Sequence, residues 1–280
     1  MKERKVIHTV QGYRTKDGAG VSLVRVLGNE TVYDFDPFLM LDSFDSSNPA
    51  DYVKGFPTHP HRGIETVSFL AKGSMTHRDN AGGKGTISDG EAQWLTAGSG
   101  AFHSEMPSGE SLLGLQLWLN MPKKDKMTAS PAYHEIKRNE IHEIPVEGGV
   151  LRLLTGNYKE YKGWQGKYLP LDYFDIHLEP NAKFSYEVES DRSVMVFTLK
   201  GDAVVGGTHL KEKTAAKLDE GDVVNIEVGK DGTEIMLMSS YATNEPIAWY
   251  GPIVMNTEGE LRTALRELQN GTFVKADTKY

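Results

Sequence analysis

The sequence contains no cysteine, which excludes disulfide bonds, thiolate metal sites and a cysteine nucleophile. It also lacks any uninterrupted apolar run near the roughly 20 residues that a helix needs to cross a bilayer. The charged start, Met1 to Lys5, is not followed by the apolar core of a signal peptide. From these shortages we predict a soluble, cytoplasmic protein that has no membrane partner.

Positive charge is also scarce. The chain has 31 Lys and Arg residues against 39 Asp and Glu residues, for a formal net charge of −8, and its basic residues form no dense patch. Proteins that bind nucleic acid depend on Lys and Arg to neutralise the phosphates. We therefore do not expect direct contact with nucleic acid.

The rest of the composition is that of a folded protein built from short strands. Of its 280 residues, 39% are hydrophobic, which is enough to form a core. Short β-rich runs alternate with turn signals and helical periodicity is rare, a pattern typical of all-β sandwiches and barrels. The predicted strands lie in Val21–Val26, Thr66–Leu70, Leu112–Leu119, Leu151–Leu154, Phe174–Leu178, Val194–Leu199, Val223–Val228 and Glu234–Ser239.

The two halves of the chain echo one another. The run Phe69-Leu70-Ala71-Lys72-Gly73 is similar to Phe197-Thr198-Leu199-Lys200-Gly201, which indicates a duplicated β-barrel. We predict an N-terminal domain over residues 1–135 and a C-terminal domain over residues 136–280, with residues 122–145 as the connection. Two such barrels packed together would be sufficient as a monomer.

One helix is predicted near residues 258–270. Thr257 and Glu260 have the spacing of a capping box, in which each side chain satisfies a free N–H group of the first turn. Leu261, Leu265 and Leu268 then repeat on one face, and Gly271 is the expected stop. We interpret this helix as a structural element that packs against a barrel.

Two short histidine motifs lie near the ends of the stretch from Gly55 to Pro107. His59 and His61 form a His-x-His pattern, and His103 and Glu105 form a His-x-Glu pattern. Residues two apart on a strand point to the same face. If the two strands pair or face each other, three imidazoles and one carboxylate converge. This is a mixed nitrogen and oxygen ligand set for a first-row transition metal, with room for open coordination positions.

Other acidic and histidine residues allow alternatives. Either motif alone is more often a hydrogen-bonded group than a pair of ligands, and it is their combination that favours a metal. Glu65 could be a further ligand, or it could hydrogen-bond to a ligating imidazole. His77 is interpreted as a loop residue or a neighbour of the ligands. His177 and Glu179 repeat only half of the pattern, so the C-terminal domain is predicted to be metal-free.

At these motifs the sequence resembles the pirin family of the cupin superfamily. The resemblance is carried by His59–Val67 and Gly90–Glu105, and it continues in Asp36–Phe44, Glu245–Ile247 and Tyr250–Thr257. It implies two cupin domains packed together, with one mononuclear, usually iron, site in the N-terminal barrel.

By position in the pirin motifs, the ligands would be His59, His61, His103 and Glu105. The general cupin pattern takes its carboxylate ligand from the first motif, where Glu65 lies. Pirins resemble the present sequence in supplying the carboxylate beside the last histidine. The resemblance therefore favours Glu105 as the ligand and leaves Glu65 as a neighbour of the ligands.

Bacterial pirin-like proteins include quercetin 2,3-dioxygenases, so the resemblance implies an enzyme whose substrates are a flavonol and O2. With Fe(II) as the divalent cofactor, the flavonol 3-hydroxyl would lose its proton and bind the metal, with Glu105 as the general base. Dioxygen would then add to the ring, which opens with loss of carbon monoxide. Phe102, Met106 and Trp94 are candidates for the apolar wall of the substrate site.

The alternative is a non-enzymatic role. Animal pirins resemble this sequence at the same ligands and are redox-sensitive cofactors of transcription regulators. The second hypothesis is therefore an iron-binding regulatory module that acts through a protein partner, and the ligands alone do not decide between the two.

Overall fold

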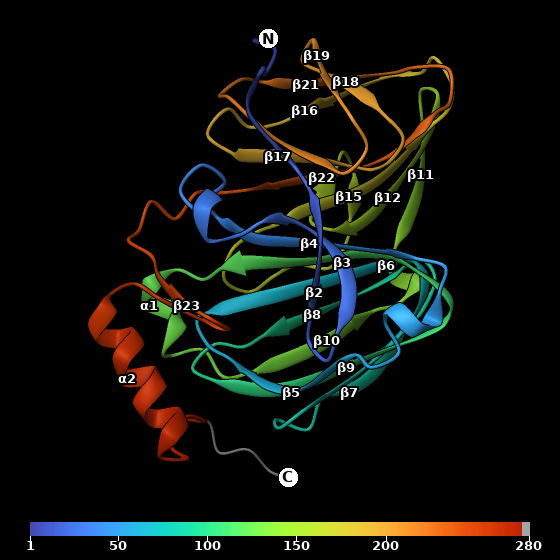
Figure 1. Cartoon of the computed structure of the whole chain (residues 1–280). Coiled ribbons are helices and arrows are strands. Elements are labelled where there is room, and N and C mark those ends of the chain that lie inside the picture. Colours follow the sequence, from blue (N-terminus) through green and yellow to red (C-terminus); the bar gives the residue numbers. More distant parts are fainter. Residues whose placement is uncertain (276–280) are drawn as a thin grey trace. The chain divides into compact units, whose positions relative to one another are not determined.

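The computed structural model of the chain describes residues 1–275, which form two compact units (Figure 1). The histidine unit comprises Arg14–Val32, Phe38–Lys137 and residues 243–275. The second unit comprises Met1–Tyr13, Tyr33–Pro37 and Arg138–Ala242. Residues 276–280, the end of the predicted C-terminal domain, lie outside the described residues.

The predicted division at residue 135 lies close to one observed boundary, but the two ends of the chain differ from the prediction. The first 13 residues belong with the second half because β1 (Val6–Gln11) pairs with β20 (Thr214–Leu218). The segment from Thr243, including the predicted helix, belongs with the first half. A single boundary in the sequence could not show where the two end segments belong, because both assignments depend on contacts between residues far apart in the sequence.

The large sheet of the histidine unit is antiparallel and runs in the order β10, β8, β6, β9, β4, β3, β2, with β5 paired to β9 and β7 paired to β6. Its strands are β2 (Tyr13–Asp17), β3 (Val21–Leu27), β4 (Phe38–Ser46), β5 (Phe56–His61), β6 (Ile64–Asp79), β7 (Lys84–Ile87), β8 (Glu91–Thr96), β9 (Ala101–Asn120) and β10 (Ala132–Ile136). The pair β23 (Ala248–Tyr250) and β24 (Ile253–Met255), the helices α1 (Lys123–Lys126) and α2 (Glu258–Gln269), and the 3-10 turns η1 (Asn29–Thr31) and η2 (Pro49–Asp51) complete the unit.

The second unit contains a large antiparallel sheet in the order β1, β20, β17, β22, β15, β12, β11 and a smaller sheet in the order β16, β21, β18, β19. Their bounds are β11 (His142–Val146), β12 (Gly149–Thr155), β15 (Asp172–Leu178), β16 (Lys183–Glu187), β17 (Ser193–Lys200), β18 (Ala203–Val205), β19 (Thr208–Leu210), β21 (Val223–Val228) and β22 (Thr233–Ser240). The short pair β13 (Asn157–Tyr158) and β14 (Tyr161–Lys162) and the turn η3 (Arg138–Glu140) complete it.

The predicted all-β class is confirmed, and each predicted β-rich run lies within a strand. Alternate residues of the strands in the second unit face one apolar core, as expected for a period of two. The predicted connection at residues 122–145 contains α1, β10 and η3 and ends within β11. The two similar Lys-Gly pairs lie at different places in their strands. Strand β17 ends at Lys200, whereas β6 continues past Gly73 with shifts in register.

Helix α2, red in Figure 1, has the predicted start and stop. The Thr257 side chain accepts a hydrogen bond from the Glu260 backbone N–H, and the Glu260 side chain bonds back to the cap. Leu261 and Ala264 are buried, and Gly271 follows the helix with a positive φ of 70°. None of the helices in residues 1–275 is long and apolar enough to cross a membrane.

The segment after β5 is tied to the C-terminal segment by Arg62 and Gly63. Arg62 is buried, donates to the Ser99 and Phe273 carbonyls and to Glu267, and stacks its guanidinium 4.1 Å from the Phe273 ring. The Val254 N–H donates to the Arg62 carbonyl. Gly63 has a φ of 79°, and a Cβ atom there would lie 1.9 Å from the Val254 carbonyl oxygen.

We expect Gly63→Ala to destabilise the protein by more than about 3 kcal/mol, because the new methyl group meets a backbone oxygen in a strained conformation. Chemical unfolding monitored by tryptophan fluorescence would measure this. Gly271→Ala is the matched control: φ is also positive there, but nothing lies within 4 Å of the added Cβ. Its cost should be about 1 kcal/mol. Equal costs at both positions would contradict the close approach of Val254.

Candidate metal centre

Strand β9 brings the histidine motifs together because it pairs with β5 on one edge and with β6 on the other. In the pairing with β5, His59 lies opposite His103. In the pairing with β6, Asp79 lies opposite His103 and His77 lies opposite Glu105. Residues directly opposite each other share a face of the sheet. One row of side chains therefore crosses three strands at His103.

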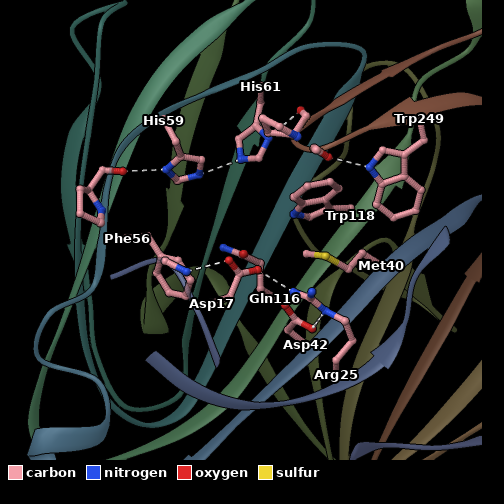
Figure 2. A pocket seen from close by; sticks show the side chains of 14 residues that line it. Asp17, Arg25, Met40, Asp42, Phe56, His59, His61, Gln116, Trp118 and Trp249 are labelled. Carbon is pink, nitrogen blue, oxygen red and sulfur yellow. Dashed lines mark hydrogen bonds and ion pairs between the residues drawn. The ribbon is translucent and has the colours of Figure 1, made fainter. Parts of the chain in front are cut away.

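Three of the predicted ligands converge through one ring nitrogen each. The Nε2 atom of His59 lies 3.0 Å from Nε2 of His61 and 3.1 Å from Nε2 of His103. Figure 2 shows His59 and His61 turned toward each other at the edge of a pocket. His61 and His103 are almost completely buried, whereas His59 is partly exposed.

Hydrogen bonds fix which nitrogen of His59 and His61 carries the proton. His59 Nδ1 lies 2.9 Å from the Pro57 carbonyl oxygen, and His61 Nδ1 lies 3.1 Å from that of Pro252. A carbonyl oxygen can only accept, so each Nδ1 is the donor, and Nε2 is the nitrogen that each ring directs inward. Burial first, and then the neighbouring His59, lowers the pKa of His61 to about 3. Its imidazole is therefore neutral.

This arrangement fits a divalent transition metal. His59 Nε2 faces the Nε2 atoms of His61 and His103 at 3.0 and 3.1 Å, so three ring nitrogens are placed to share one cation. Neutral imidazole nitrogens are typical ligands for iron, nickel, copper and zinc. Burial also lowers the pKa of His103 well below its ordinary value, with His61, His59 and His77 adding to the effect, so its ring is neutral as well.

Glu105, the fourth predicted ligand, belongs to a second group. Its carboxylate lies with His103 and His77 in a set whose ligand atoms are all within 4.8 Å of one another. Gln93 Nε2 donates to Oε1 at 2.6 Å, Gln116 Nε2 donates to Oε2 at 2.6 Å, and Ser68 is 3.3 Å from Oε1. Both carboxylate oxygens are thus held in place by amide donors. His103 belongs to both groups and links Glu105 to the three imidazoles.

A pocket of about 490 Å³ opens beside His59 and His61 (Figure 2). One part of its wall is polar: Arg25 pairs with Asp42 through Nε and Nη2, and Nη2 also contacts Asp17. The apolar and aromatic part of the lining is formed by Met40, Phe56, Trp118 and Trp249. The Trp118 ring lies 4.9 Å from that of His61, so the aromatic wall reaches the histidines.

The residues predicted for the apolar wall do not form it. Trp94 is buried and donates to Glu65, Phe102 packs on Phe273, and Met106 is 40% exposed. The aromatic lining comes instead from Phe56 on β5, Trp118 on β9 and Trp249 on β23. Trp249 is far from the histidine motifs in sequence, and only the return of the C-terminal segment brings it to the pocket.

Sequence reasoning also missed the contacts of His77. It lies in β6 and not in a loop, and its side chain is fully buried between Tyr133 and His103. The Tyr133 ring is stacked on it at 3.9 Å, and the Tyr133 hydroxyl donates to Gln93 Oε1. His77 and Asp79 have the same two-residue spacing as the recognised motifs, and that spacing was the signal available in the sequence.

Glu65 has partners other than an imidazole. Oε1 accepts hydrogen bonds from Trp94 Nε1 at 2.9 Å and from Thr96 Oγ1 at 2.6 Å. Ser68 on the same strand faces Glu105, and since side chains alternate along a strand, Glu65 points to the other face of the sheet. Burial raises the pKa of Glu65 to about 7, although its two hydrogen-bond donors favour the carboxylate.

A further group of polar side chains lies in the second unit, where Asp175, His177 and Glu234 approach one another. Arg152 Nε donates to Asp175 Oδ2 at 2.6 Å, and Arg152 Nη2 lies 3.1 Å from His177 Nε2. The hydrogen bond to Asp175 raises the pKa of His177. A guanidinium already supplies positive charge to these carboxylates. The metal-free character of the C-terminal domain stays a prediction.

Comparison with known proteins agrees with these features. The family model described as pirin matches residues 20–119, and that of the pirin C-terminal cupin domain matches residues 173–274. A pirin-like protein of Caulobacter vibrioides is 38% identical over 278 residues, covering 98% of this chain and 100% of that one. Pirin of Homo sapiens is 36% identical over 275 residues, covering 95% of this chain and 93% of that one.

Among solved structures, a quercetin 2,3-dioxygenase from Acinetobacter baumannii superposes with a TM-score of 0.89 at 32% identity. The match covers 97% of this chain and 99% of that chain. The predicted fold class, an all-β protein of cupin domains with a short C-terminal helix, is confirmed.

Glu65 should make stability depend on pH. The unfolded chain releases this proton near the ordinary pKa of 4.5, whereas the folded protein keeps it until about pH 7. Between these values the folded state binds more protons, so the free energy of unfolding falls as the pH rises. The loss is complete above pH 7 and amounts to about 3 kcal/mol.

Glu65→Gln keeps an acceptor for Trp94 and Thr96 and carries no charge. Its stability relative to the unsubstituted protein should therefore increase by about 3 kcal/mol between pH 5 and pH 8, measured by urea unfolding. Glu110→Gln, at an exposed position, should show no such trend. If the difference in unfolding free energy between Glu65→Gln and the unsubstituted protein is the same at pH 5 and pH 8, the carboxyl group of Glu65 is not protonated in the folded protein.

Proposed function

Because the chain belongs to the pirin family, we propose that it is a metal-dependent dioxygenase that cleaves flavonols such as quercetin with O2 and releases carbon monoxide. The observation that carries this proposal is the convergence of three imidazole nitrogens beside an aromatic-lined pocket. The structural similarity to a protein named quercetin 2,3-dioxygenase supports the choice of reaction.

In this proposal His59, His61 and His103 hold one divalent metal, Fe(II), and Glu105 provides the carboxylate ligand. Bound Fe(II) would supply Lewis acidity toward a substrate oxygen and the redox chemistry of O2. The protein's part is to orient the imidazoles so that their Nε2 atoms are directed inward. The Pro57 and Pro252 carbonyls do this for His59 and His61.

The pocket suits a flat, uncharged aromatic molecule that carries hydroxyl groups. Its volume of about 490 Å³ is in the usual range for small-molecule sites. Trp118 and Trp249, whose ring centroids are 5.6 Å apart, offer aromatic contact. Asp17, Asp42 and Arg25 carry two negative charges and one positive charge, so the polar wall does not favour an anionic substrate, whereas its carboxylates can accept hydrogen bonds from hydroxyl groups.

Glu105 is proposed to accept the proton of the substrate hydroxyl. Its carboxylate is held by Gln93 and Gln116, and Gln116 also lines the pocket. Glu105 itself is buried behind that lining, so a shift of its side chain toward the pocket has to accompany proton transfer. Such a shift costs two amide hydrogen bonds, which would return once the proton is released.

The first test is carbon monoxide release from quercetin in air by protein loaded anaerobically with Fe(II). His61→Ala should lose metal and reduce release to background, because it removes one of three converging nitrogens. His209→Ala is a matched control on an exposed histidine that pairs with Asp202, and it should leave both measurements unchanged.

Release by metal-free His61→Ala protein would contradict the mechanism. Unsubstituted protein that binds iron at one atom per chain and releases no carbon monoxide would refute quercetin cleavage, and would favour the redox-sensitive binding role.

Trp249→Ala should raise the KM for quercetin about fivefold and change kcat little. An aromatic contact is worth about 1 kcal/mol, and a contact made equally in the ground and transition states acts on KM. Steady-state kinetics with varied quercetin concentration would measure both constants. A fall in kcat with no change in KM would place Trp249 outside the substrate-binding wall.

A further inference from the structure

The side chains of His103, His77 and Asp79 form a hydrogen-bonded series that leads away from the three converging nitrogens. His103 Nε2 faces His59, while its other ring nitrogen, Nδ1, lies 3.4 Å from His77 Nδ1. His77 Nε2 then lies 2.8 Å from Asp79 Oδ2. The side chains of His77 and Asp79 are 0% and 1% exposed, so water does not compete for these contacts.

The acceptors at the far end determine where the protons lie. Asp79 Oδ1 accepts hydrogen bonds from the backbone N–H groups of Ala81 and Gly83, both at 2.8 Å. Burial alone would raise the pKa of Asp79, but the bonds from His77, Gly83 and Ala81 outweigh it and lower the pKa. An ionised carboxylate only accepts, so the proton between the two residues sits on His77 Nε2.

The position of this proton determines the tautomers of His77 and His103. A neutral imidazole protonated at Nε2 has an acceptor at Nδ1. His77 Nδ1 can therefore accept only from a protonated His103 Nδ1. His103 is then the tautomer whose Nε2 lone pair points toward His59 and His61, which is the form that binds a metal.

We propose that His77 and Asp79 are positioning residues that fix the tautomer of His103 and raise the electron density at its Nε2 atom. This inference rests on the proposed metal centre but not on dioxygenase activity. His59 and His61 donate to peptide carbonyls, whereas His103 is joined through His77 to a full negative charge. A carboxylate linked to a ligating histidine orients the ring and increases its basicity.

The surroundings of His77 hold it in this role and not in that of a ligand. Both of its ring nitrogens are occupied, one by His103 and the other by Asp79. Its ring lies parallel to that of Tyr133, with an interplanar angle of 2°. The Tyr133 hydroxyl is in turn bonded to Gln93, which holds Glu105. Rotation of His77 toward the proposed metal would break its contacts with His103, Asp79 and Tyr133 together.

The unsubstituted protein allows a direct test. In protein labelled with 15N and loaded with Zn(II), long-range 1H–15N spectra distinguish the tautomers of each histidine. We expect His77 to be neutral with its proton on Nε2, and His103 to carry its proton on Nδ1 with Nε2 bound to zinc. A His77 ring that is protonated on Nδ1, doubly protonated, or bound to zinc would overturn the inference.

Asp79→Asn tests the negative charge with nearly the same shape. The variant should bind Zn(II) 10–100-fold more weakly in a chelator competition, the effect typical of losing such a partner of a ligating histidine. The Fe(III)/Fe(II) midpoint potential should shift to a more positive value, because less electron density reaches the metal. Asp89→Asn is the matched control: Asp89 also accepts a backbone N–H, from Gly73, and its side chain pairs with Lys72.

Zinc affinity and potential in Asp79→Asn equal to those of Asp89→Asn would overturn the inference. If Asp79→Asn does not fold, the spectra of the unsubstituted protein decide. Failure of the unsubstituted protein to bind Zn(II) at these residues would overturn both the metal centre and this inference. Normal zinc binding with the expected tautomers and no carbon monoxide release would support the inference and refute only the proposed dioxygenase.

Discussion

The pairing of β9 with a different strand on each edge is the constraint on which the candidate site depends. It places His103 between His59 on β5 and Asp79 on β6. Because side chains in one row share a face, this single register brings together three converging imidazoles and the carboxylate behind them. A slip of one residue in either pairing would turn one set of side chains to the opposite face and disperse the site.

The buried polar groups around this row are arranged so that each has a defined role. Carbonyl oxygens orient His59 and His61, and amide groups hold both oxygens of Glu105. His61, His103 and Glu105 are buried, which strengthens their interactions and makes an unpaired partner costly. Glu65, on the other face of the same sheet, shows the opposite outcome: there burial dominates and the carboxyl group keeps its proton near neutral pH.

Local patterns in the sequence were sufficient for the fold class and for the common face of His59 and His61, because both are encoded by short spacings. Alternation predicted the strands, the pair Thr257 and Glu260 predicted the start of α2, and the two-residue spacing of His59 and His61 predicted their common face. The pocket could not be predicted in this way. Arg25, Trp118 and Trp249 come from three separate strands, and nothing in their own neighbourhoods marks them as a wall. The hydrogen bonds from Gln93 and Gln116 to Glu105 could not be predicted either, because they join residues on different strands or far apart in the sequence.

The attachment of the C-terminal segment to Arg62 and His61 has a consequence for the order of events during synthesis. The Pro252 carbonyl that orients His61 and the Glu267 carboxylate that pairs with Arg62 leave the ribosome after the whole second unit. Domains generally fold as they emerge, N-terminal first. The Glu267 partner of Arg62 and the Pro252 acceptor of His61 therefore become available only when synthesis is almost complete. A nascent chain that stops short of residue 252 lacks the carbonyl group that orients His61.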